Sequence, residues 1–344
     1  MNIDVEYWRM TQTLEQKCKD LIVDLNLGRS DEIASIVPLT GGVASDIASV
    51  VVGKTQYCVK FALPKLKVAA DWRAPVHRNA AEYAWLQVAA DIVPQSAVQL
   101  FGRSEQAHGF AMEYVTGNQV YLWKARLLAG AAPKGEAAVV GDMIGRIHAA
   151  SSARGFDRTP FQNRDDFRAL RIEPYLTFTA RSHPDVAGQL NALAGMLYGS
   201  SAVLVHGDVS PKNILFRDGG AIILDAECAT MGDASFDPAF CLNHLVLKSV
   251  HIPERRSELL AEVGAFWSAY AAHVTWEPTD VLGGRIARLL PALMLGRVDG
   301  KSPVEYLDEA ERAQVRALAI SLIKEPSSTL SKVVERLTTG LKEA

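Results

Sequence analysis

Two polar clusters, each directly after an apolar β-prone run, constrain this chain more than any other feature. The first follows Leu204-Val205, the second follows Ile222-Ile223-Leu224, and they read His206-Gly207-Asp208-Val209-Ser210-Pro211-Lys212-Asn213 and Asp225-Ala226-Glu227. The apolar run 214–216 and a Gly219-Gly220 turn between them are typical of a hairpin. A hairpin would bring the carboxylates of Asp208 and Asp225 and the amide oxygen of Asn213 into one small volume. Oxygen ligands of this kind suit Mg²⁺, which shares its remaining coordination positions with phosphates.

Each of these residues has a simpler interpretation when it is taken alone. An Asp before a Pro-Asn turn is usually a turn residue, and an Asp that ends an apolar strand often caps the next loop. The compound pattern is hard to obtain by chance, because Asn213 follows Asp208 by five residues and Asp225 follows Asn213 by twelve. We therefore interpret the pattern as catalytic and expect His206 to be a scaffold residue that bonds the loop backbone.

The paired motifs resemble those of the aminoglycoside phosphotransferase and choline kinase family, small-molecule relatives of the protein kinases. The second motif continues to Asp237 as Asp225-Ala226-Glu227-Cys228-Ala229-Thr230-Met231-Gly232-Asp233-Ala234-Ser235-Phe236-Asp237. Ala234 stands where the family usually has Pro, and Pro238 stands where Leu is common. Both departures follow the metal residues, so they concern the path of the loop more than the chemistry.

The resemblance implies a two-lobed, protein-kinase-like α+β fold with a small antiparallel β-rich lobe and a larger, mainly helical lobe. It also implies transfer of the γ-phosphate of ATP, with Mg²⁺, to a hydroxyl of a small molecule. Asp208 would be the catalytic base, and Asn213 and Asp225 would hold the metal.

The parts of an ATP-binding lobe can be sought upstream of the motifs. Three β-prone runs are predicted at 34–40, 47–53 and 56–62. Gly41, Gly42 and Ser45 lie between the first two runs. Glycine there permits a close approach of backbone N–H groups to phosphate, and an ordinary hairpin turn is the alternative.

The third run places Lys60 among apolar neighbours, where an ammonium group needs an anionic partner. Helical periodicity is predicted for 77–90, and Arg78 and Glu82 within it resemble the R-x-x-x-E of the family. The resemblance implies that Lys60 holds the α and β phosphates while Glu82 orients it. A solvated surface position is the alternative for Glu82.

A strand that runs from Gly109 into a Thr116-Gly117 hinge closes this lobe. The resemblance implies that the Glu113 carbonyl and the Val115 amide bind the adenine edge. We expect an ATP-binding lobe at 1–117, which includes a helix at 4–26, and a catalytic and substrate-binding lobe at 118–344. Helices are predicted in the second lobe at 119–130, 134–152, 237–251, 255–273, 281–297, 309–324 and 327–342.

The sequence defines the acceptor less well than the nucleotide. An aminoglycoside would need an acidic cleft, and a choline-like cation would need aromatic faces and a carboxylate. Instead, one predicted helix carries Asn243, His244 and Lys248, and the segment 297–302 reads Arg-Val-Asp-Gly-Lys-Ser. This partly basic set favours a sugar or another neutral or anionic hydroxylated metabolite, although the second segment is equally typical of a helix end with Gly300 as its stop. The acceptor candidates are Ser210, Glu227, His244, Arg297 and Asp299.

Three other functions compete with this interpretation: a kinase for a cationic acceptor, a nucleotide-binding regulator without turnover, and a helical interaction protein. The net charge of −3 over 344 residues, with no basic stripe, argues against nucleic acid as a partner. The four cysteines show no C-x-x-C spacing, and Cys58 and Cys228 are expected to be reduced and buried. No apolar leader or run of about 18 apolar residues is found, which predicts a cytoplasmic protein without a membrane partner.

Overall fold

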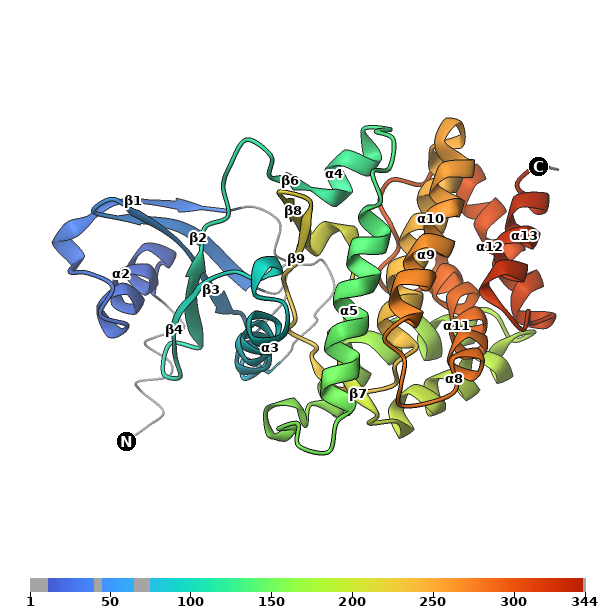
Figure 1. Cartoon of the computed structure of the whole chain (residues 1–344), viewed down its shortest axis with the longest axis horizontal. Helices are drawn as coiled ribbons and strands as arrows, with labels where there is room; N and C mark the ends of the chain where they lie inside the picture. The colour runs from blue at the N-terminus through green and yellow to red at the C-terminus, as the bar shows by residue number, and fades with distance from the viewer. Residues whose placement is uncertain (1–11, 40–44, 65–74, 343–344) are drawn as a thin grey trace.

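A computed structural model of the chain describes residues 12–39, 45–64 and 75–342 (Figure 1). Gly41 and Gly42, and residues 4–11 of the predicted first helix, lie outside the described residues. An antiparallel sheet at one end of the molecule is followed by a largely helical region at the other (Figure 1). The predicted α+β fold of the protein-kinase-like type is confirmed.

The sheet has five strands in the order β1-β2-β3-β5-β4, and each neighbouring pair is antiparallel. The first three strands fall where the β-prone runs predict them, with their ends shifted by at most two residues. The strands are β1 Ile33–Pro38, β2 Ser45–Val52, β3 Thr55–Ala62, β4 Leu100–Ser104 and β5 Gly109–Glu113.

A helix covers each face of this sheet, because successive strand residues point to opposite sides. Val59, Phe61 and Ala111 are buried with helix α2 (Leu14–Asp24). Cys58 and Phe110, which alternate with them, are buried with α3 (Arg78–Ile92) on the other face. The alternation therefore fixes which face Lys60 shares, namely the face of Cys58 and α3.

The helical region follows a short strand, β6 (Tyr121–Leu122), which pairs with β8 and takes the place of the start of the helix predicted at 119–130. The other predicted helices agree closely with the structure. Gly141 on α5 allows a close helix contact, since a Cβ there would lie 2.4 Å from the carbonyl oxygen of Phe266 on α10. The helices are α4 Trp123–Leu128, α5 Glu136–Ser152, α6 Arg164–Phe167, α7 Phe178–Ser182, α8 Ala187–Gly199, α9 Phe236–His251, α10 Arg256–Ala271, α11 Thr279–Asp299, α12 Glu309–Lys324 and α13 Leu330–Gly340, and a π-helical segment spans Arg168–Thr177.

Two small antiparallel sheets lie where the sheet and the helices meet (Figure 1). Strand β7 (Val203–Val205) pairs with β10 (Thr230–Gly232), and β8 (Ile214–Arg217) forms the predicted hairpin with β9 (Gly220–Ile223). The hairpin turn is Asp218-Gly219, and φ is +52° and +83° at these residues. Two positive φ angles are what a two-residue type I′ turn requires.

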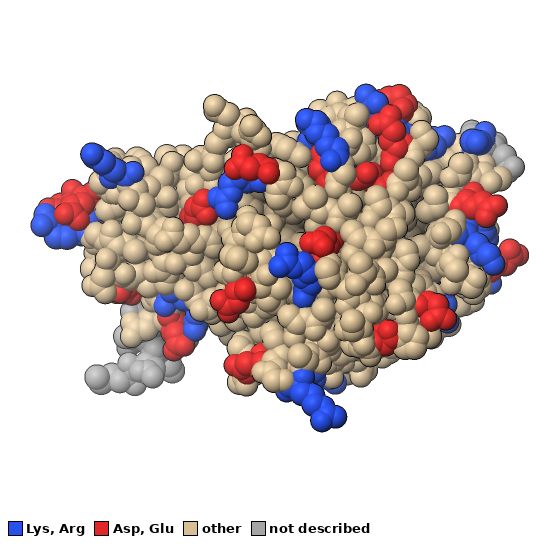
Figure 2. Space-filling view, in the orientation of Figure 1, with Lys and Arg blue, Asp and Glu red and all other residues tan. Residues whose placement is uncertain are grey.

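The surface charges and the cysteines say little about the function. On the face shown in Figure 2, acidic and basic side chains are scattered and intermixed. Cys58 and Cys228 are buried free thiols, as predicted, and burial raises the pKa of each to about 12. Among the described helices, none has the length and apolar character that a membrane crossing requires.

Candidate active site

The two polar clusters come together at one end of the β8–β9 hairpin. The loop after β7 carries Asp208 and enters β8 through a 3-10 turn at Pro211–Asn213. Asp225 follows β9, and the amide of Leu224 donates to the carbonyl of Asn213 at 2.9 Å. The convergence expected from the hairpin pattern is therefore present.

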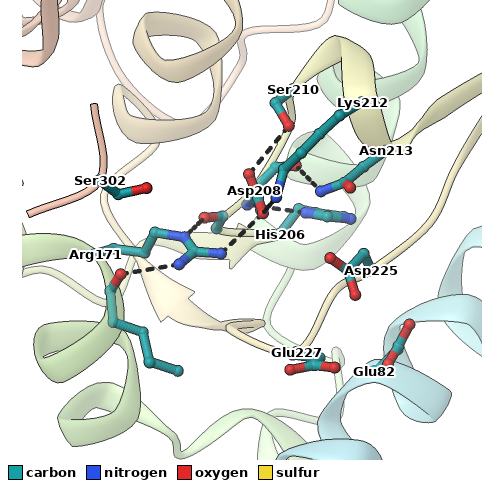
Figure 3. Close-up of polar contacts among 12 residues, drawn as sticks. Glu82, Arg171, His206, Asp208, Ser210, Lys212, Asn213, Asp225, Glu227 and Ser302 are labelled. Atoms are coloured by element: carbon teal, nitrogen blue, oxygen red, sulfur yellow. Dashed lines mark hydrogen bonds and ion pairs between the residues drawn. The ribbon is translucent and has the colours of Figure 1, made fainter. Parts of the chain in front are cut away.

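Asp208 is buried and its carboxylate is held from three sides (Figure 3). Oδ2 lies 3.0 Å from Nη2 of Arg171 and 3.1 Å from Nζ of Lys212. Oδ1 accepts a hydrogen bond from the Ser210 hydroxyl at 3.1 Å. The side-chain nitrogen Nδ2 of Asn213 donates to the backbone carbonyl of Asp208 at 3.1 Å. The side-chain oxygen of Asn213 is therefore the group available to a ligand.

These contacts determine the charge of Asp208. Burial would raise the pKa of the carboxyl, but the Lys212 ammonium and the Arg171 guanidinium outweigh burial and hold the pKa well below its usual range. Asp208 is therefore ionised at every physiological pH. Since a depressed pKa also makes it a weak base, orientation of a hydroxyl is the larger part of what it can offer.

A buried scaffold holds the Asp208 loop in place. Asp237 on α9 accepts hydrogen bonds from the amides of His206 and Gly207 at 2.7 and 2.9 Å. Nδ1 of His206 accepts the amide of Asp208 at 3.0 Å, so the predicted scaffold role of His206 is confirmed. Gly207 has φ +82°, and a Cβ there would lie 2.8 Å from Cβ of Cys228. This position therefore requires glycine.

Lys60 is the centre of a second buried group of charges. Its Nζ lies 2.8 Å from Oε1 of Glu82, contacts Oδ1 of Asp225, and lies 3.3 Å from Oε1 of Glu227. Glu82 is only 1% exposed, so its alternative as a solvated surface residue is wrong. Burial would lower the pKa of Lys60, but the carboxylates of Asp225 and Glu82 outweigh it, and the group remains an ammonium.

Glu227 connects two further side chains, those of Arg78 and Ser45, to this network. Its Oε2 pairs with Nε of Arg78 at 2.7 Å, and its Oε1 accepts from the Ser45 hydroxyl. Glu227 is one of the acceptor candidates, but these contacts place its carboxylate beside Lys60 instead. The pairing of Arg78 with Glu227 was not predicted.

The charge balance of the network suits a divalent cation. Two cations, Lys60 and Arg78, face three carboxylates, those of Glu82, Asp225 and Glu227, so the formal sum is −1. Oxygens of the three carboxylates lie within 4.8 Å of one another. Burial, with Asp225 and Glu227 close by, raises the pKa of Glu82 even though Lys60 opposes the shift. An excess of negative charge among hard oxygen donors fits Mg²⁺.

The residues predicted to bind adenine, Glu113 and Val115, lie where the five-stranded sheet is joined to the helical region. Glu113 ends β5, its amide donates to the Gln99 carbonyl at 2.8 Å, and its carboxylate contacts Arg217 on β8. Val115 is half-buried in the connection to β6. The adenine contacts of both residues remain a prediction.

Of the acceptor candidates, only Ser210 touches Asp208. Asp299 is the last residue of α11, and Gly300 follows it. The second interpretation of the segment 297–302, that of a helix end, is therefore correct. Its carboxylate is bound by Arg316 at 2.6 and 2.7 Å and by His183 at 2.8 Å. The structure therefore does not bring Asp299 into the site. His244 lies on α9 and Arg297 on α11.

Arg171 and Lys212 are site residues that the sequence reasoning did not select. Lys212 lies inside the first motif, and its spacing of four from Asp208 was a usable signal. Arg171 lies on the π-helical segment, and its side chain reaches both the Gly207 carbonyl and Asp208. No local motif marks it.

A buried Lys–Glu pair between sheet and helix, facing an Asp loop across a hairpin, defines a protein of the kinase-like phosphotransferase class. Residues 35–273 match the phosphotransferase enzyme family, and the chain belongs to this family. It is a small-molecule kinase of this family, as predicted.

Several solved structures share the fold. The chain is 14% identical to an amicoumacin kinase solved with AMP-PNP, Ca²⁺ and Ami (TM-score 0.55, 97% of this chain and 100% of the other). It is 15% identical to a choline/ethanolamine kinase family protein from Mesorhizobium loti (TM-score 0.54, 96% and 99%). It is 16% identical to a choline kinase from Streptococcus pneumoniae (TM-score 0.50, 96% and 99%). A comparison with curated proteins finds no match.

Proposed function

We propose that this kinase transfers the γ-phosphoryl group of Mg²⁺-bound ATP to a hydroxyl of a small neutral or anionic metabolite, with Asp208 as the catalytic base. One observation carries the proposal. A buried Lys60 with an excess of carboxylates lies beside an ionised Asp208 that Arg171 and Lys212 hold in place. The structurally similar amicoumacin kinase, solved with a nucleotide analogue and a divalent cation, supports it.

The nucleotide-binding roles follow from the positions of the residues. Asp225 and Asn213 would hold Mg²⁺, which when bound neutralises charge on the transferring phosphate. Lys60 would bind the α and β phosphates while Glu82 orients it. Ser45 is the first residue of β2, lies beside Glu227 and would approach the phosphates. The adenine would lie against the main chain of Glu113 and Val115.

The transfer requires little covalent work from the protein. A bond forms between the acceptor oxygen and the γ-phosphorus, the bond to the β–γ bridging oxygen breaks, and ADP leaves. The hydroxyl proton passes to Asp208 late, because the transition state is loose. The low pKa of Asp208 agrees with this order, since positioning and not basicity is what its surroundings favour.

Arg171 acts as a positioning residue for Asp208. We expect Arg171→Met to lower kcat by up to about 10²-fold, the effect of a small misplacement of a reacting group. Loss of the guanidinium also raises the pKa of Asp208, so the acidic limb of the kcat profile should move to higher pH. Arg171→Lys keeps the positive charge but not the planar guanidinium, so the acidic limb of its kcat profile should stay near the wild-type position. An unshifted limb in Arg171→Met would show that Arg171 does not act through Asp208.

Nucleotide binding can be tested without knowledge of the acceptor. Mg·ATP at a hundred times its Kd should stabilise the folded protein by about 2.7 kcal/mol, and EDTA should remove most of the gain. Thermal unfolding with ATP, with and without Mg²⁺, measures this. A screen of hydroxylated metabolites for ADP release then tests turnover. Stabilisation without ADP release from any acceptor class would favour a nucleotide-binding regulator, and the absence of both would contradict the proposal.

A further inference from the structure

We propose that three side chains in the helical region, His244 and Lys248 on α9 and Arg297 on α11, bind an anionic group of the acceptor, either a phosphate or a carboxylate. We call these residues the basic cluster. The inference rests on the proposed function and adds the chemical class of its substrate, which is a hydroxylated metabolite that carries a negative charge.

Lys248 is buried without a counter-ion. Its side chain is 1% exposed, and within the described ranges no carboxylate oxygen lies within 4.0 Å of its Nζ. Its polar contact is the Tyr306 hydroxyl at 3.5 Å, and the ammonium lies 4.8 Å from the centre of that ring. Glu305, a carboxylate whose charge acts on Lys248, is engaged by Lys124. Burial, together with Lys124 and Arg297, lowers the pKa of Lys248 to about 7, so the amine is only partly charged near neutral pH. An anionic ligand would favour its ammonium form and provide the missing partner.

Arg297 has unused hydrogen-bonding capacity beside Lys248. Its Nη1 donates to the Ser302 carbonyl at 2.5 Å and to the Tyr175 and Ser302 hydroxyls, both at 3.2 Å. Its Nε is buried and has no partner among the residues that the structure describes, and none of their carboxylates lies within 4.0 Å of its guanidinium. A guanidinium with free donors suits the paired oxygens of a carboxylate or a phosphate.

His244 is the member of the basic cluster on which the charge of Asp208 acts. It lies one helical turn from Lys248 on the same face of α9, with its ring 5.5 Å from that of Phe240. Burial lowers its pKa well below the usual range, and Arg297 and Lys248 lower it further, while the Asp208 carboxylate opposes them. His244 therefore stays neutral, lies within the field of Asp208, and can donate one hydrogen bond to an anion.

The Ser302 partner of Arg297 and the nucleotide network lie on different sides of Asp208. In Figure 3, Ser302, which accepts from Arg297, lies on one side of Asp208, and Asp225, Glu227 and Glu82 lie on the other. In the proposed site, an acceptor with its hydroxyl at Asp208 would place a second group on the Ser302 side, at the cluster. A cationic group there would meet like charges, and Asp299 on the same helix is already occupied by Arg316 and His183.

Phosphate binding tests the site directly. Inorganic phosphate would be titrated calorimetrically into the full-length protein saturated with Mg·ADP, so that the nucleotide site is filled. Wild type should bind phosphate, and Lys248→Met and Arg297→Met should each raise the Kd at least about tenfold, the effect of one lost charge-assisted hydrogen bond. Lys54→Met, in the exposed turn between β2 and β3, is the matched control and should bind as wild type does.

A stability measurement covers the case in which a variant folds poorly. Lys248→Met removes a buried charge without a partner, so its Tm in the absence of phosphate should be higher than that of wild type. Phosphate should raise the Tm of wild type but not that of the variant. No phosphate binding by wild type, or equal affinity in wild type and both variants, would overturn the basic cluster as an anion site.

Two sets of three acceptors distinguish a phosphate from a carboxylate as the anionic group. Each set has a neutral, a phosphorylated and a carboxylated member: glycerol, glycerol 3-phosphate and glycerate in the first, and glucose, glucose 6-phosphate and gluconate in the second. We expect phosphorylation of an anionic member, with a KM at least about tenfold higher in Lys248→Met and an unchanged KM for Mg·ATP. Turnover of neutral or cationic acceptors alone, at a KM that both variants leave unchanged, would defeat the inference and leave the kinase function intact. Failure of Mg·ATP to bind would contradict the proposed kinase function. In that case, loss of phosphate binding in the variants would still support the basic cluster as an anion site.

Discussion

Asp208→Asn should lower kcat by about 10²–10⁴, the contribution of a general base, while the affinity for Mg·ATP changes little. The substitution keeps the size of the side chain and its bond to Ser210, but removes the charge that orients the hydroxyl and receives its proton. The nucleotide should bind nearly as before, because the Lys60 network does not include Asp208 among its ion pairs. Steady-state kinetics and nucleotide titration separate the two effects.

The same substitution leaves Arg171 and Lys212 without their shared carboxylate, so its stability must be measured as well. Circular dichroism and Tm show whether the variant is folded under the assay conditions. Asp218→Asn is a matched control, because Asp218 lies in the exposed turn of the same hairpin and Asn tolerates its positive φ. Wild-type turnover in a folded Asp208→Asn protein would remove Asp208 from the base role.

The parts of the site that the sequence predicts are those that local geometry determines. The hairpin between Asn213 and Asp225 follows from two apolar runs and a turn, and its register brings both residues to one end. Strand alternation places Lys60 on the face that α3 covers, and helical spacing places Glu82 on the facing side of that helix. The period of one element and the order of the elements place these side chains, whereas the pairing of Lys60 with Glu82 was implied by the family resemblance.

The contacts that the sequence did not predict join residues far apart in the chain. Arg78 pairs with Glu227 across 149 residues, and Arg171 reaches Asp208 from a π-helical segment that no periodic pattern identifies. Asp299 was chosen by its neighbours in sequence, but the packing of α12 against α11 gives it Arg316 as a partner. Such pairings depend on how whole helices dock, and single-sequence patterns do not contain that information.

The charge balance around Lys60 leads to a second large effect, in Asp225→Ala. Removal of this carboxylate changes the formal sum of the network from −1 to 0, because Lys60 and Arg78 then face only Glu82 and Glu227. The variant should therefore fold, and the pKa of Glu82 should fall because a neighbouring negative charge is lost. A loss of nucleotide affinity would then report on the metal site and not on unfolding.

We expect Asp225→Ala to bind Mg·ATP about 10- to 100-fold more weakly than wild type, the range for loss of a contact to a charged group. More decisive is the dependence on Mg²⁺, since Asp225 and Asn213 are the residues assigned to the ion. Titration of ATP at several Mg²⁺ concentrations should show affinity that rises with Mg²⁺ in wild type and stays nearly flat in Asp225→Ala. Asn213→Ala should show an intermediate slope, because it removes one neutral ligand. Equal slopes in all three proteins would mean that these oxygens do not hold the ion, and the assignment of the Asp208 loop as a kinase centre would then lose its electrostatic basis.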